Sequence, residues 1–277
     1  MIPSVLEKYR HLTEEALSQF VSSLNPSLPL QAAMAYALQT GGKRMRPILV
    51  FLIAEALGKN RRVSHAALAV EFFHTASLIA DDLPCMDNDE IRRGVPTLHK
   101  VFNEATALLA SYALIAAGYE KIATSSDAIV TAARNMGIEG ATEGQFLDLF
   151  SQEHSSEKIK ETIEKKTSTF FELSFVFGWL FGGGDHQELL LVKKAASHFG
   201  MAFQLSDDFL DLEQDRGQKN SQNYVNFMGV EQGRLLFNQE IEELKQTLKK
   251  LQILSPEFLS LIQTVEERVS AINLSSY

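Results

Sequence analysis

Helical periodicity runs along almost the whole chain, and it constrains the fold more than any other feature. Apolar residues recur at spacings of three and four, and no stretch alternates convincingly between apolar and polar residues as a half-buried strand would. Glycine and proline divide this pattern into segments long enough for multi-turn helices. These segments cover about residues 4–23, 28–40, 44–57, 62–83, 98–123, 126–150, 156–181, 186–213, 230–250 and 255–273. The pattern predicts an all-α fold.

The chain reads as one domain that spans residues 1–277. Its hydrophobic content of 45% is enough for one large core. No low-complexity linker, change in composition or fixed-period repeat marks a second unit. We therefore predict a single-domain helical bundle.

Composition also limits the classes of function. A net charge of −9 argues against nucleic acid as the main partner. The single cysteine, Cys85, excludes an internal disulfide framework and fits a reducing cytoplasm. No secretory signal is visible at the start, and the least polar stretch, residues 105–118, is shorter than the roughly 20 residues of a membrane span. We expect a cytoplasmic protein with no membrane span.

The first of two aspartate clusters follows an apolar helical segment, residues 71–80. Pro84 disfavours helical geometry in the residue before it, so Asp81 and Asp82 should lie at the C-terminal end of the helix. The helix dipole is negative there, and carboxylates at this end are unfavourable unless a cation compensates them. Mg²⁺ fits, because it takes oxygen ligands and keeps waters that leave room for substrate phosphates.

The residues after Pro84 extend this cluster. Asp87 can approach the same ion once the chain loops back, and Arg92 and Arg93 follow it closely. Alone, this charge run fits a solvated ion-pair surface equally well. The apolar helix that leads into it favours a function.

A second cluster lies late in another long apolar segment. Asp207 and Asp211 are i,i+4 neighbours, and like charges at this spacing destabilise a helix unless something screens them. Gln204 and Asp208 lie on the same broad face. An exposed acidic face is the ordinary explanation, but the surrounding apolar residues, including Phe209, make simple exposure a poor fit. Two such clusters predict two walls of one cavity around a metal-bound diphosphate.

Basic residues provide the complementary charge. Gly41 and Gly42 precede Lys43 and Arg46, and tandem glycines let the backbone turn sharply or approach a ligand. Spacing by three places both cations on one helical face. Arginine grips phosphate in a planar fork, and lysine acts as a point charge. A helix start with solvated bases is the alternative.

Other polar residues carry weaker signals. Lys166 and Thr167 fit an exposed helical face as well as a binding site. A lone histidine on an apolar helix, such as His74, is more often a buried core residue with its hydrogen bonds satisfied.

Taken in order, these motifs resemble the trans-type prenyl diphosphate synthases, the family of farnesyl and geranylgeranyl diphosphate synthases. A single DDxxD motif is weak evidence, but the ordered set is specific and covers nearly the whole chain. The set comprises residues 41–47, 71–75, 81–94, 96–97, 144–145, 166–167 and 203–211. The resemblance implies helices around a deep central cavity, and a homodimer.

The resemblance also implies the reaction and the residues that serve it. Isopentenyl diphosphate would condense head-to-tail (1′-4) with an allylic diphosphate to give a short-chain trans prenyl diphosphate. Three Mg²⁺ ions would bind the allylic diphosphate through Asp81, Asp82, Asp87, Asp207, Asp208 and Asp211. Arg92, Lys166, Thr167 and Gln204 would contact the allylic diphosphate, and Lys43, Arg46, His74 and Arg93 would bind isopentenyl diphosphate.

The chain departs from the family pattern at three places. The segment 215–224 is short, and Lys219 is its only lysine, so we assign it to diphosphate binding in place of the family's usual lysine. Ser111 and Tyr112 stand where a Gly-Asp pair is common. Val95 replaces a common lysine. None of these changes removes an expected metal ligand.

Product length follows from the helix before Asp81. Ala76 and Ser77 are small, whereas farnesyl-specific members often carry an aromatic residue near this level. Small residues leave room for about one more isoprene unit, or one helical turn of ~5.4 Å. Phe73 and Phe72, one turn deeper, would form the next floor. We predict a C20 product, with C15 as the alternative.

Two other functions stay open. A non-catalytic regulatory subunit of a prenyl synthase heteromer would share the fold, although such subunits tend to lose the acidic motifs that are intact here. A terpene cyclase shares an ionisation-type acidic motif but lacks the counterparts of Lys43, Arg46 and Arg93.

Overall fold

The computed structural model describes residues 3–151, 155–214 and 223–272, and it confirms the predicted all-α class. The helices before the first acidic cluster are η1 (Ser4–Leu6), α1 (Glu7–Ser22), α2 (Pro29–Gln39), α3 (Met45–Ala56) and α4 (Ser64–Asp81). Those between the clusters are α5 (Leu98–Val101), α6 (Glu104–Ile122), α7 (Ser126–Met136), α8 (Ala141–Phe150), α9 (Ser156–Ile163), the π-helix η2 (Glu164–Ser168), α10 (Thr169–Gly182), η3 (His186–Glu188) and α11 (Leu189–Leu210). The last are α12 (Tyr224–Met228), α13 (Val230–Lys250) and α14 (Pro256–Ser270).

The predicted segments differ from the helices in a few places. The segment 126–150 forms two helices, α7 and α8, because Gly140 holds a tight turn in which a Cβ would lie 2.2 Å from the Asn135 carbonyl oxygen. A small hairpin of β1 (Ile91–Arg92) and β2 (Val95–Pro96) was not predicted, since strands of two residues are too short to show alternation.

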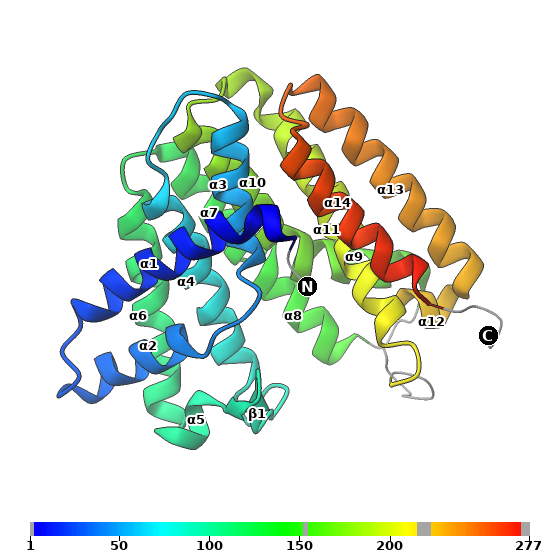
Figure 1. Cartoon of the computed structure of the whole chain (residues 1–277). Coiled ribbons are helices and arrows are strands. Elements are labelled where there is room, and N and C mark those ends of the chain that lie inside the picture. Colours follow the sequence, from blue (N-terminus) through cyan, green and yellow to red (C-terminus); the bar gives the residue numbers. More distant parts are fainter. Residues whose placement is uncertain (1–2, 152–154, 215–222, 273–277) are drawn as a thin grey trace.

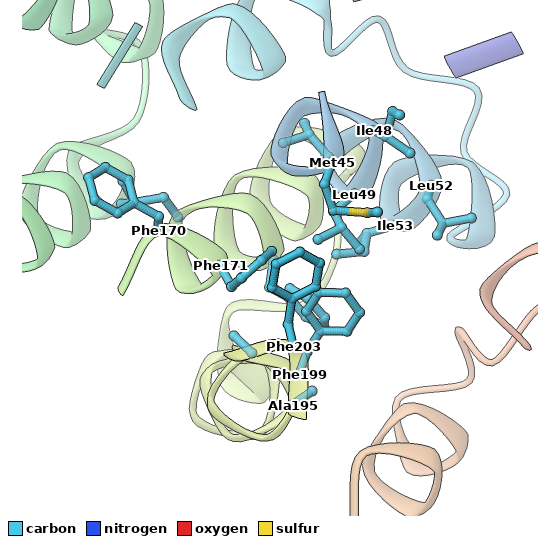
Figure 2. Packing of buried hydrophobic residues seen from close by; sticks show 14 of the residues in the cluster. Met45, Ile48, Leu49, Leu52, Ile53, Phe170, Phe171, Ala195, Phe199 and Phe203 are labelled. Carbon is cyan, nitrogen blue, oxygen red and sulfur yellow. The ribbon is translucent and has the colours of Figure 1, made fainter. Parts of the chain in front are cut away.

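Helix α10 forms the centre of the larger hydrophobic core. It is apolar on all sides, which is typical of a helix surrounded by others. Figure 2 shows side chains of α3, α10 and α11 meeting there. The ring centroid of Phe171 lies 4.9 Å from that of Phe199 and 5.0 Å from that of Phe203. Helices α13 and α14 pack on α11 along one side of the molecule, and α1, α2 and α6 lie on the other (Figure 1).

Helix α4 runs between the two halves of the core and ends at the first acidic cluster. Its residues are buried along most of its length, and α6 packs against it with small residues such as Ala107 and Ala110. No helix in the described part of the chain is both long enough and apolar enough to cross a bilayer.

A buried ion pair fixes the connection between α2 and α3. Arg44 adopts a left-handed backbone conformation with φ of 50° and is 4% exposed. Its guanidinium donates to Glu71 of α4, to Glu14 of α1 (2.8 Å) and to the Leu38 carbonyl oxygen (2.7 Å). Burial alone would lower the pKa of Arg44, but Glu71 and Glu14 outweigh burial and raise it. Arg44 thereby ties three helices together beside Lys43 and Arg46.

The ion pair predicts unequal effects of two glutamate substitutions. Glu71→Gln should lower the free energy of unfolding by about 3–5 kcal/mol, because it leaves a buried guanidinium without its main counter-charge. Glu14→Gln, in which the lost carboxylate has a side-chain exposure of 41%, should cost at most about 1 kcal/mol. Urea unfolding curves measure both, and equal losses would contradict this role of Glu71.

Candidate functional site

The first acidic cluster lies where α4 ends. Asp81 is the last residue of the helix, and Asp82 caps it. The chain then turns back, so that the Asp87 amide donates to the Asp81 carbonyl oxygen at 2.9 Å. Gln145 of α8 donates to the Asp87 carboxylate at 3.1 Å. Asp81 and Asp87 therefore lie together at one edge of the site.

Electrostatics make Asp81 unusual. Burial raises the pKa of the Asp81 carboxyl to about 7, with Asp87 adding to the rise and Lys166 opposing it. A carboxylate at this position is therefore unfavourable on its own, and a cation would stabilise it.

Asp82 has a different environment. Its side chain is 6% exposed and accepts from Arg92, which also donates to Asp89 at 2.8 Å. Burial raises the pKa of Asp82, and Arg92 opposes the rise. Arg92 thus compensates the buried Asp82 carboxylate in part, and the contact holds the Arg92 guanidinium in place.

The hairpin after the first cluster separates the two arginines. Arg93 and Gly94 form its turn with φ of 54° and 79°, and two positive φ values match the twist of a tight hairpin. Arg92 then points back to Asp82, whereas Arg93 donates to the Gly41 carbonyl oxygen. Gly42 has a φ of 123°, which residues with a side chain rarely adopt, and a Cβ on it would lie 2.7 Å from the Arg93 guanidinium carbon. Gly42 thus leaves space for Arg93.

The second acidic cluster lies at the end of α11. Asp208 is 4% exposed and accepts from the Gln204 amide and the Tyr224 backbone N–H, both at 2.9 Å. Gln204 in turn accepts from the Thr167 hydroxyl at 2.9 Å. Asp208 therefore orients Gln204 and Thr167, and its contacts are with the protein, as they are for Asp82.

Asp207 lies near the basic residues just before and at the start of α3. Burial raises the pKa of its carboxyl, and Lys43, Arg268 and Arg46 oppose the rise while Asp211 adds to it. Arg268 of α14 lies 3.5 Å from the Asp207 carboxylate. The structure thus brings Lys43 and Arg46 to the second acidic cluster.

Arg46 and His74 form a polar pair in an aromatic surrounding. The Arg46 Nη1 lies 3.2 Å from His74 Nε2, and its guanidinium carbon lies 4.8 Å from the ring centre of Phe171. Burial lowers the pKa of Arg46 to about 10, and burial together with Arg46 lowers the pKa of His74 well below its usual value, so the histidine is neutral. Arg46 Nε and His74 Nδ1 are buried and have no hydrogen-bond partner among the residues that the structure describes. A buried unpaired donor costs free energy that a ligand oxygen could offset.

Lys166 and Thr167 lie on the π-helix η2, which interrupts the path from α9 to α10. Gly144 of α8 lets this segment approach, since a Cβ on it would lie 2.4 Å from the Lys166 backbone nitrogen. Lys166 donates to Asp148 of α8. Burial lowers the pKa of Lys166, but Asp148, Asp81 and Asp87 together outweigh burial, and the net shift is upward. The ammonium therefore stays charged and points toward the first cluster.

A cavity of about 550 Å³ extends from Asp81 between α4, α6, α7 and α8. Its wall includes Ala76, Ser77, Ser111, Tyr119 and Met136. Ala76 is fully buried in this wall, whereas Ser77 is partly exposed. Ser111 donates to the Ala76 carbonyl oxygen at 3.0 Å, which gives this departure from the family pattern a role in joining α6 to α4.

The predicted position of Phe73 needs correction. Phe73 is fully buried and does not line the cavity; its ring packs at 5.2 Å on Tyr119, which does. The aromatic residue that meets the cavity at this depth comes from α6.

The aspartates do not form a complete metal shell by themselves. No group of three or more histidine, cysteine or acidic side chains is gathered for a metal within the described ranges. Mg²⁺ is commonly held by one or two carboxylates together with waters and substrate phosphates. The acids that face the site therefore fit Mg²⁺ that binds together with a diphosphate. Lys219 lies outside the described residues.

Four contributors to the site were missed from the sequence. Glu71 and Arg268 act through side chains distant in sequence, and no local spacing indicates them. Asp148 gave a weak signal three residues after Gln145, and Tyr119 gave none. Each depends on helix packing that only the fold reveals.

Comparison with known proteins agrees with this geometry. The polyprenyl synthetase family model matches residues 28–225. Farnesyl diphosphate synthase of Geobacillus stearothermophilus is 37% identical over 225 residues, 76% of each chain. Geranylgeranyl pyrophosphate synthase 4 of Arabidopsis thaliana is 41% identical over 209 residues, 71% of this chain and 56% of that protein.

Solved structures agree as well. A geranyltranstransferase from Thermotoga maritima superposes with a TM-score of 0.82 at 28% identity, over 96% of this chain and 99% of that one. An FPP/GFPP synthase from Zymomonas mobilis gives a TM-score of 0.81 at 28% identity, over 95% and 98%. Because the family model covers residues 28–225 and the fold agrees, the chain belongs to the polyprenyl synthetase family.

Proposed function

We propose that the protein is a short-chain trans prenyl diphosphate synthase that makes geranylgeranyl diphosphate. The proposal rests on one observation, that a charged region and an apolar cavity adjoin within a single site. Acidic pairs and cations meet at the mouth, and an apolar cavity of about 550 Å³ begins directly below Asp81. A diphosphate with a hydrocarbon tail matches both parts. The names of the two relatives, farnesyl and geranylgeranyl synthases, support the same substrate class.

We assign Mg²⁺ binding to Asp81, Asp87, Asp207 and Asp211. Asp82 and Asp208 belong to the same motifs, but Asp82 holds Arg92 and Asp208 holds Gln204. They therefore position the side chains that bind diphosphate. Bound Mg²⁺ would stabilise the negative charge that develops on the departing diphosphate. A set of three ions fits a substrate that supplies most of the ligands.

The basic and polar residues of the site divide between the two substrates. The allylic diphosphate would be held by residues around the acidic clusters, namely Arg92, Lys166, Thr167 and Gln204. Lys43, Arg46, Arg93 and His74 would hold isopentenyl diphosphate, and the unpaired Arg46 Nε and His74 Nδ1 supply unmet hydrogen-bonding capacity there.

The reaction needs no protein nucleophile. The allylic C1–O bond breaks, and its electron pair leaves with the diphosphate. The alkene of isopentenyl diphosphate donates its electron pair to C1 and forms the new C–C bond. A proton then leaves from C2 of the former isopentenyl unit to the released diphosphate, which restores a double bond. The apolar cavity protects the intermediate carbocation from water.

The assembly we propose is a homodimer. Large side chains on α6 are exposed, with Leu109 at 53% and Tyr112 at 59%. They are three residues apart and therefore lie on one face of the helix, which favours a subunit contact there. A heterodimer is the alternative assembly, because one relative, 40% identical over 73% of this chain, is named a large subunit of a heterodimeric geranylgeranyl pyrophosphate synthase. Equilibrium sedimentation gives the assembly state.

The direct test is turnover by the purified chain alone. We incubate it with Mg²⁺, radiolabelled isopentenyl diphosphate and each allylic primer, and separate the products by chromatography. A labelled C20 product that disappears with EDTA supports the proposal. Labelled product that stops at C15 supports the farnesyl alternative. Absence of product, with turnover restored by a catalytic partner, would assign the chain to the regulatory class.

Product length should respond to the helix before Asp81. Ser77→Phe or Ala76→Phe should shorten the longest product to C15, because the new ring occupies the upper cavity. Ala123→Phe, the same kind of change at an exposed position beyond α6, is the matched control and should leave product length unchanged. Chromatography of the labelled products measures the product length. A C20 product from both cavity variants would contradict this prediction.

Asp81 should make stability depend on pH in metal-free protein. The folded-state pKa of about 7 lies above the usual value of 3.8, so the folded chain binds this proton more readily than the unfolded chain. The stabilisation is full below about pH 4 and is lost as the pH rises through 7. Relative to Asp81→Asn, the wild type should lose up to about 1.4 kcal/mol per pH unit in this window. Urea unfolding in EDTA measures it; a difference that stays flat would contradict the burial of this acid.

A further inference from the structure

We propose that Tyr119 of α6 forms the floor of the cavity and sets the maximum length of the product. This inference rests on the proposed function. It assigns a specificity-determining role to a residue outside the motifs and on a different helix from Ala76 and Ser77.

The depth of the cavity can be followed along two helices. On α4, Asp81 marks the mouth, and Ser77 lies one turn below it. On α6, Ser111, Ile115 and Tyr119 follow at intervals of four, so they form one stripe along the cavity wall. Ser111 bonds to the carbonyl of Ala76, and Tyr119 packs on Phe73. Tyr119 is therefore the deepest member of the stripe relative to Asp81.

Tyr119 has a rigid support. Its ring meets Phe73 edge-to-face, with centroids 5.2 Å apart and an interplanar angle of 69°. Phe73 is fully buried, and Gly118 provides the space for it, since a Cβ at this glycine would lie 2.7 Å from the Phe73 ring. Phe73 has no room to move away from the cavity in this packing. Tyr119 thus rests on a fixed ring.

The opposite wall is softer. Ala133 and Met136 of α7 line the same cavity. Alanine leaves space, and methionine is unbranched and changes shape easily. Of these three side chains, the ring of Tyr119, supported by Phe73, is the one that a growing hydrocarbon chain cannot displace at low cost.

The position of this floor matches one added unit. Four residues of α4 separate Ser77 from Phe73, a rise of about 6 Å. This is close to the length of one isoprene unit. A block at Ser77 would therefore stop the chain one unit earlier than a block at Tyr119, and removal of Tyr119 would release a further unit.

Substitution of Tyr119 tests the inference. Purified Tyr119→Ala is supplied with Mg²⁺, labelled isopentenyl diphosphate and farnesyl diphosphate, and the products are separated by chain length. We expect the longest product to gain at least one five-carbon unit over that of the wild type. Tyr119→Phe keeps the ring and should keep the wild-type length. A second change in the other direction, Tyr119→Trp, should reduce the longest product by one unit or raise the share of shorter product.

The outcomes separate the two levels of the argument. An active Tyr119→Ala enzyme whose longest product equals that of the wild type overturns the role of Tyr119 and leaves the proposed function intact. A wild-type chain without turnover overturns the proposed function itself. If circular dichroism shows that Tyr119→Ala does not fold, Tyr119→Leu and Tyr119→Trp provide the same comparison, and unchanged length in both also overturns the inference.

Discussion

The buried contact between Arg44 and Glu71 is the interaction on which the arrangement of the site depends. It lies among α1, α3 and α4, and it holds a residue with a left-handed backbone in place. Lys43 and Arg46 flank Arg44, so their directions follow from its fixed position. A buried charge with well-placed partners adds little net stability, but it disfavours every alternative packing that would leave it unpaired. The positions of Lys43 and Arg46 therefore depend on Arg44, whose own side chain bonds to Glu14 and Glu71.

The same division of roles recurs within each acidic cluster. Asp82 and Asp208 accept hydrogen bonds from protein groups, Arg92 and Gln204 respectively. Burial raises the pKa values of Asp81 and Asp207, and the nearby cations compensate it only in part. In each cluster one carboxylate, Asp82 or Asp208, positions a neighbouring side chain. The other, Asp81 or Asp207, would be stabilised by a bound cation. Asp148 of α8 likewise positions a neighbour, because it accepts from Lys166 of η2 and helps to keep the ammonium charged beside Asp81. Internal ion pairs thus fix the positions of Arg92 and Lys166 at the site.

The sequence predicts the local elements well and the contacts between them poorly. The helix that ends at Asp81 follows from Pro84, and the return of the chain toward Asp81 follows from the position of Asp87. The separate partners of Arg92 and Arg93 do not, because they depend on a two-residue turn with positive φ at Arg93. Phe73 was expected at the cavity floor from its place on α4. The crossing of α4 and α6, which places Tyr119 in front of it, is set by Gly118, and no periodicity shows that.

The π-helix η2 has a consequence for how this site can vary. A π-turn contains one residue more than an α-turn over the same path, so it offsets the helical register by about 100°. Without that residue, α9 would continue into α10 with the side chains on one side rotated relative to the other. Phe170 and Phe171 belong to the hydrophobic core on the α10 side, whereas Lys166 bonds to Asp148 and Thr167 bonds to Gln204 beside the acidic clusters. The extra residue therefore lets one continuous helical segment direct its α10 side chains to the core and its η2 side chains to the acidic clusters. Deletion of a single residue here would rotate one of these two sets of side chains away from its contacts.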